Sequence, residues 1–205
     1  MAEFHDRKQQ IDAPVMTFPD AVRAHVERRY AKARIILEYG SGGSTALAAQ
    51  MPDKYIQSVE CDFDWAVNMR SHLDEIETVS GVVIYPVDIG PVGMWGRPVD
   101  ATHWEKFQRY PVDIWDQPFF RHPDLVLIDG RFRPACFAAT CLRITQPVRV
   151  LFDDYYNRPQ YHEIEELAKP VRRIDRMAEF RLKPQDFSPQ DITRALRFFA
   201  QASYA

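Results

Sequence analysis

Short apolar runs that alternate with helix-like segments constrain this chain most. Five runs of five or six residues, rich in Val, Ile and Leu, are separated by longer amphipathic stretches. The runs predict strands at 34–38, 55–60, 82–87, 124–128 and 148–152, with helices at 44–51, 62–73, 134–143 and 159–168. Such alternation implies right-handed crossovers and helices on both faces of the sheet. We therefore expect an α/β fold with a doubly wound, mainly parallel sheet.

The segments outside this alternation complete the predicted architecture. Residues 19–32 predict a helix, which makes 1–33 a helical N-terminal extension. Residues 88–123 are too long for a structureless loop and carry seven aromatic side chains. We expect them to form an aromatic-rich insertion after the third strand, folded over the carboxyl ends of the strands. The length of 205 residues suits one domain, so 1–205 is predicted to be a single domain.

The chain beyond the fifth predicted strand should add two late strands and a final helix. The late strands are predicted at 171–176 and 178–183. Ser188 and Asp191 have the spacing of a capping box, so they predict the start of the last helix. The apolar residues of that helix predict its buried stripe, namely Ile192, Ala195, Leu196 and Phe199.

Composition removes several classes of protein. The net charge of −3 disfavours a nucleic-acid binder that relies on phosphate contacts. The three cysteines include no Cys-x-x-Cys pair, which disfavours a zinc site or a disulfide framework. No secretory leader and no apolar run of membrane-spanning length is visible. We therefore expect a cytoplasmic protein with no membrane or nucleic-acid partner, and self-association stays open.

A glycine-rich turn after the first predicted strand is the strongest local signal. It reads Glu38-Tyr39-Gly40-Ser41-Gly42 and leads into a helix through Ser44 and Thr45. Glycines permit tight turns and close approach of a ligand to the backbone. The turn lacks the Gly-Lys-Ser/Thr of a phosphate-binding loop, and Thr45 replaces the third glycine of the dinucleotide fingerprint. The acidic Glu38 would repel phosphate and favour an ammonium group.

This acidic Gly-x-Gly motif resembles the first motif of the class I S-adenosylmethionine-dependent methyltransferases. The next strand ends agree with it. Glu60 lies 22 positions after Glu38, where an acidic residue suits both ribose hydroxyls, and Asp88 ends the third strand. The resemblance covers roughly residues 34–152 and implies S-adenosylmethionine as cofactor. The predicted cofactor-binding residues are Glu38, Gly40, Ser41, Gly42, Ser44, Glu60, Cys61, Asp88, Ile89 and Asp129.

Acidic residues also end the fourth and fifth predicted strands. Asp129, Asp153 and Asp154 resemble the metal triad of cation-dependent O-methyltransferases, and oxygen ligands of this kind suit Mg²⁺. Arg131 stands where those enzymes tend to have an acid, and Arg133 follows it. Because a guanidinium pairs well with a carboxylate, we favour a site without metal and keep Mg²⁺ as the alternative.

Asp129, Arg131 and Arg133 are the catalytic candidates, and His103 and His122 are further candidates for a general base. The sequence predicts methyl transfer, most plausibly to a hydroxyl of a small molecule that carries an anionic group. Two alternatives remain open at this point. One is a nicotinamide-dependent oxidoreductase, whose ribose Glu60 would hold equally well. The other is a non-catalytic module that binds S-adenosylmethionine.

Overall fold

The structure, a computed structural model, describes residues 13–200, so residues 1–12 of the predicted N-terminal extension lie outside the described part. The strands are β1 (Ile35–Tyr39), β2 (Tyr55–Glu60), β3 (Gly81–Pro86), β4 (Leu125–Ile128), β5 (Val148–Phe152), β6 (Arg172–Ile174) and β7 (Met177–Leu182). The helices are α1 (Asp20–Lys32), α2 (Gly43–Ala49), α3 (Phe63–Glu75), α4 (Trp104–Phe107), α5 (Arg109–Val112), α6 (Arg133–Arg143) and α7 (Pro189–Ala200). Three short 3-10 helices are η1 (Met94–Gly96), η2 (Asp113–Asp116) and η3 (Pro159–Glu166).

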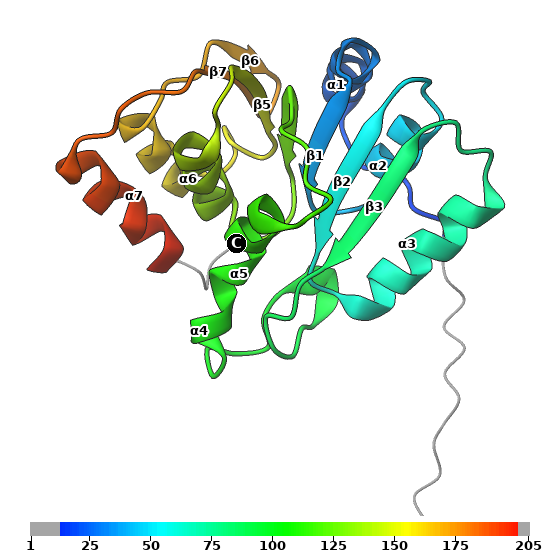
Figure 1. Cartoon of the computed structure of the whole chain (residues 1–205), viewed down its shortest axis with the longest axis horizontal. Helices are drawn as coiled ribbons and strands as arrows, with labels where there is room; N and C mark the ends of the chain where they lie inside the picture. The colour runs from blue at the N-terminus through cyan, green and yellow to red at the C-terminus, as the bar shows by residue number, and fades with distance from the viewer. Residues whose placement is uncertain (1–12, 201–205) are drawn as a thin grey trace, which may run out of the picture.

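One seven-stranded sheet runs through the molecule in the order β3-β2-β1-β4-β5-β7-β6 (Figure 1). β1 to β5 are parallel to their neighbours, and β7 pairs antiparallel with both β5 and β6. The predicted α/β class with a doubly wound, mainly parallel sheet is confirmed. All the described strands share this sheet, and the extent of the domain over 1–205 stays a prediction.

Helices cover both faces of the sheet because its strand side chains alternate between two cores. Leu37 and Tyr39 join the larger core, which includes α5, α6 and α7. Ile36 packs instead with Val22 and Val26 of α1 on the other face. In Figure 1, α5 to α7 and α1 to α3 lie on opposite sides of the sheet. No helix among residues 13–200 has both the length and the apolar character needed to cross a bilayer.

A side-chain cap explains the start of α3. Asp62 caps α3 by accepting the backbone N–H of Trp65 at 3.0 Å.

Two sequence predictions need correction. The segment after β5 forms a 3-10 helix, η3, where the sequence predicted an α-helix over 159–168. The predicted stripe of α7 is also wrong in part, because Ala195 and Phe198 are its buried residues while Ile192 and Leu196 are exposed.

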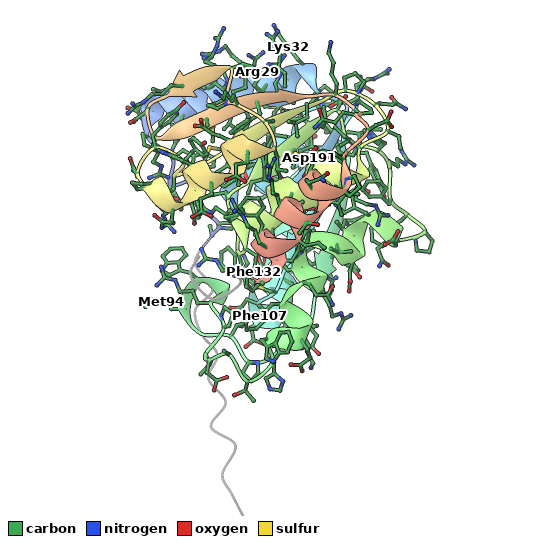
Figure 2. All side chains as sticks on the ribbon, turned by 90° about the vertical axis from the view of Figure 1, so that its left-hand side faces the viewer. Arg29, Lys32, Met94, Phe107, Phe132 and Asp191 are labelled. Carbon is green, nitrogen blue, oxygen red and sulfur yellow. The ribbon has the colours of Figure 1, made fainter. Side chains whose placement is uncertain are left out.

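Several aromatic residues of the predicted insertion complete the core. Its Tyr110 and Trp115 are buried, and the Trp115 indole donates to the Tyr39 hydroxyl at 2.8 Å. Phe107 stacks on Phe132 with ring centroids 5.3 Å apart, and the two rings lie close together in Figure 2. The insertion is therefore anchored against β1 and the loop that follows β4.

Candidate active site

A cavity of about 470 Å³ opens at the carboxyl ends of β1, β2 and β4. This is the edge where parallel α/β sheets bind ligands, at the point where the strand order reverses. Its walls come from residues 13, 15–18, 40–44, 60, 62, 65, 95, 96, 110 and 129–131. Five predicted cofactor residues lie in this wall with Asp129, namely Gly40, Ser41, Gly42, Ser44 and Glu60. The catalytic candidate Arg131 is also in the wall.

The turn after β1 is fixed by its contact with the loop after β4. Gly40 has a φ angle of +101°, which favours glycine. A Cβ atom on Gly40 would lie 2.8 Å from the Gly130 Cα atom, so the two backbones leave no room for a side chain. Gly42 is different, because a Cβ atom there would meet nothing within 4 Å. Gly40 therefore shapes the turn, and Gly42 leaves space beside the cavity.

Glu38 is buried behind the turn and does not line the cavity. This corrects the prediction that Glu38 contacts the ligand. The Glu38 side chain is fully buried, and its oxygens accept the hydroxyls of Tyr30 and Thr45, each at 2.6 Å. The Thr45 hydroxyl in turn accepts the backbone N–H of Gly42 at 3.0 Å. Burial raises the pKa of Glu38, while these hydroxyl donors oppose the rise. Sequence reasoning missed Tyr30 and Thr45, which hold Glu38 in this role.

Glu60 faces the cavity with both carboxylate oxygens already hydrogen-bonded. Its Oε2 accepts the Ser41 hydroxyl at 2.9 Å, and its Oε1 accepts the backbone N–H groups of Cys61 and Asp62 at 2.8 and 3.0 Å. Burial raises the pKa of Glu60, and these donors oppose the rise. A ribose hydroxyl at this carboxylate would compete with the Ser41 hydroxyl.

Three other predicted cofactor residues do not line the cavity. Cys61 is buried, with its Sγ atom 3.3 Å from the Gly96 carbonyl oxygen. The Asp88 carboxylate is held by the Lys106 ammonium at 2.8 Å and by the Gly90 N–H, while Ile89 is buried in the larger core. The side chains of Cys61, Asp88 and Ile89 therefore make contacts outside the cavity wall.

The predicted metal triad also needs correction, because arginines occupy its carboxylates. Asp153 is buried and accepts a bidentate pair of hydrogen bonds from Arg176, at 3.1 and 2.7 Å. Asp154 pairs with Arg176, with Arg158 at 2.9 Å and with Arg133 at 3.3 Å. Between residues 13 and 200, no group of three or more His, Cys, Asp or Glu side chains is arranged to hold a metal ion.

Arg133 is the centre of this network rather than a cavity residue. Its side chain is only 4% exposed and pairs with the Asp129 carboxylate at 3.0 Å. It also donates to three backbone carbonyl oxygens, those of Asp129, Gly130 and Asp153. Arg133 was predicted as catalytic, and this geometry gives it a positioning role behind Asp129.

Asp129 and Arg131 face the cavity together. The Asp129 side chain is 32% exposed and lines the cavity. Burial raises the pKa of Asp129 to about 7, opposed by the Arg133 guanidinium and reinforced by the Asp153 and Asp154 carboxylates. The guanidinium of Arg131 is mostly buried, and that burial lowers its pKa. The cavity thus offers a proton acceptor that titrates near neutrality beside a cation.

Neither histidine candidate lines the cavity. His103 lies on the insertion, where its ring packs beside Gly90. His122 precedes β4, and its Nε2 accepts the backbone N–H of Thr145 at 2.9 Å.

The sequence analysis also missed the segment 15–18 and Trp65, which line the cavity from outside the motifs. No motif marks that segment, in which Phe18 is buried and Val15 is exposed.

Comparison with known proteins identifies the family. The chain is 42% identical to a methyltransferase-like protein from Silicibacter pomeroyi DSS-3, with a TM-score of 0.86 over 94% of this chain and 99% of that one. An O-methyltransferase from Bacillus cereus, solved with S-adenosylhomocysteine, is 15% identical, with a TM-score of 0.49 over 92% of this chain and 71% of that one. A methyltransferase from Agrobacterium tumefaciens, described as dependent on S-adenosylmethionine, is 11% identical, with a TM-score of 0.40 over 82% and 63%.

The first of these similarities carries the assignment, and the other two add no argument to it. No protein-family profile matches the sequence, and the search of curated proteins gives no match. The chain belongs to the class I S-adenosylmethionine-dependent methyltransferases. The antiparallel β7, placed between β5 and β6, also departs from the 3-2-1-4-5-6 order of the dinucleotide-binding fold. This removes the nicotinamide-dependent alternative.

Proposed function

We propose that this methyltransferase acts on a hydroxyl group of a small molecule that also carries an anionic group. The observation that carries the proposal is the placement of Asp129 and Arg131 in one cavity with the glycine turn and Glu60. The cavity volume of about 470 Å³ is within the range of small-molecule sites. The net charge of −3 supports an acceptor other than a nucleic acid.

The residues at the glycine turn fit the cofactor of this family. The open space at Gly42 allows a ligand to approach the backbone, and Glu60 offers a carboxylate for ribose hydroxyls. Gly40, Ser41 and Ser44 complete this part of the wall. When bound, S-adenosylmethionine would supply the activated methyl group. The task of the chain is then to position the acceptor oxygen and to exclude water.

Asp129 and Arg131 have separate roles toward the acceptor. The Asp129 carboxylate accepts the hydroxyl proton, because its pKa of about 7 leaves it largely ionised in weakly alkaline solution. Arg131 binds the anionic group of the acceptor and so orients the hydroxyl toward Asp129. Arg133 holds the Asp129 carboxylate in place through the 3.0 Å ion pair.

A methyl-transfer assay tests the proposal and the role of metal together. Hydroxyl compounds with and without a carboxylate or phosphate group are incubated with the enzyme and S-adenosylmethionine, and S-adenosylhomocysteine is measured. We expect turnover of anionic acceptors that a chelator does not reduce, since arginines occupy the carboxylates of Asp153 and Asp154. Turnover that stops with the chelator and returns with Mg²⁺ would contradict the metal-free site. Binding of the cofactor without turnover of any acceptor would favour the non-catalytic alternative.

The two glycines of the turn should respond differently to alanine. In Gly40→Ala, the new Cβ atom meets the Gly130 backbone at a φ of +101°, so we expect a loss of about 2–3 kcal/mol in the free energy of unfolding. In Gly42→Ala, the methyl group enters open space, so the unfolding free energy should stay within about 0.5 kcal/mol while S-adenosylhomocysteine binding weakens. Denaturant unfolding and calorimetry measure the two effects, and equal unfolding curves for both variants would contradict this account.

A further inference from the structure

A closed loop of the insertion presents one tryptophan to the cavity. The loop spans residues 93–97 and is closed by the Gly93 N–H, which donates to the Arg97 carbonyl oxygen at 2.7 Å. A bridge between Val92 and Pro98 flanks it. Trp95 lies at its tip, lines the cavity and is 73% exposed. Figure 2 shows the neighbouring Met94 at the surface of the molecule, far from Arg29 and Lys32 at the end of α1.

The backbone of this loop holds Trp95 in an uncommon conformation. The φ angle of Trp95 is +64°, which is rare and costly for a bulky residue. Such strain persists only where the surroundings fix it, and it clusters at ligand-binding positions. Here Gly96 fixes the loop against the end of β2, because its carbonyl oxygen lies 3.3 Å from the Cys61 Sγ atom. The backbone that carries Trp95 is therefore held beside the end of β2 without help from a ligand.

The position of the loop relates Trp95 to Glu60. A Cβ atom on Gly96 would lie 3.6 Å from the Glu60 Oε1 atom, so the residue beside Trp95 lies close to the predicted ribose carboxylate. The base of a nucleoside is joined directly to its ribose, so a ribose bound at Glu60 places the base near this loop. Neither Asp88 nor Ile89 lines the cavity, since the Asp88 carboxylate pairs with Lys106 and Ile89 is buried in the core.

We propose that Trp95 forms the stacking surface for the base of a nucleoside bound at Glu60, in place of Asp88 and Ile89. The inference rests on the proposed function for the identity of the nucleoside, namely the adenosyl part of the cofactor. A planar base stacks on an indole without requiring directed hydrogen bonds. The closed loop lowers the cost of binding, because its backbone is already fixed.

Calorimetric titration with S-adenosylhomocysteine and with adenosine tests this assignment. Trp95→Ala should weaken the binding of both ligands by about 5- to 150-fold, as for the loss of one base–aromatic stack. Trp95→Phe should keep affinity within about threefold of wild type, because it retains a ring. Trp104→Ala is the matched control, since Trp104 is 71% exposed on the same insertion and does not line the cavity.

The outcomes separate this inference from the proposed function. Equal affinity of the wild type and Trp95→Ala for both ligands would overturn the role of Trp95 and leave the cofactor assignment intact. Equal losses in Trp95→Ala and Trp104→Ala would also overturn it. Binding of adenosine that depends on Trp95, without binding of S-adenosylhomocysteine, would support the stacking surface and overturn the proposed cofactor. Failure of the wild type to bind either ligand would overturn both.

Discussion

Replacing Asp129 with asparagine should lower the rate of methyl transfer by at least about 100-fold, the lower end of what a positioned general base contributes. The amide keeps the size of the side chain but cannot take the hydroxyl proton of the acceptor. The backbone carbonyl bonds of Arg133 remain, so Asp129→Asn should still fold, which its melting temperature checks. A variant that retains more than about a tenth of the wild-type rate would contradict the base assignment.

The pH dependence of the wild-type rate follows from the same carboxylate. Burial raises the pKa of Asp129 to about 7, so the group is protonated and unable to accept a proton below that pH. The rate of the wild-type enzyme should therefore fall as the pH drops through about 7 and level off above it. In Asp129→Asn, the residual rate should lack this transition. A transition that persists unchanged in the variant would assign it to another group.

Replacing Arg133 with alanine should cause the largest loss of stability. Arg133 is 4% exposed, pairs with the Asp129 and Asp154 carboxylates and donates to three backbone carbonyl oxygens. Its removal leaves buried charges and carbonyl groups without this partner. We expect a loss of about 3–5 kcal/mol, which corresponds to a fall in melting temperature of about 6–20 °C for a chain of this size.

Arg158→Ala provides the control for Arg133→Ala. The Arg158 side chain is more exposed and pairs with Asp154 at the edge of the network. Its removal should therefore cost less than about 1 kcal/mol. Thermal unfolding of both variants makes the comparison. Similar small losses would mean that Arg133 does not hold the network together.

The sequence predicted the sheet well because its signals are local. Each strand is a short apolar run, and each glycine or acidic residue of the turn after β1 lies within a few positions of the next. A motif of this kind can be recognised without knowing what surrounds it. The alternation of strands and helices then implies right-handed crossovers, which place helices on both faces of the sheet. The prediction of a mainly parallel sheet with helices on both faces is therefore confirmed.

The parts that failed depend on contacts between distant segments. Glu38 was assigned to the ligand because its sequence position does not reveal that Tyr30 and Thr45 enclose it. The sequence analysis favoured arginines over a metal at these carboxylates, but it named Arg131 and Arg133 and missed Arg158 and Arg176, which lie outside the motif and pair with Asp154 and Asp153. Trp95 reaches the cavity through the packing of the insertion, for which no spacing rule exists.

The central claim is that the chain binds the cofactor of its family with Glu60 at the ribose. Calorimetric titration of S-adenosylhomocysteine into the wild type and Glu60→Ala tests this most directly. The account predicts saturable one-site binding to the wild type, weakened about 5- to 150-fold in the variant because two ribose hydroxyls lose their acceptor. Absence of saturable binding to the wild type, or equal affinity of the two proteins, would contradict it.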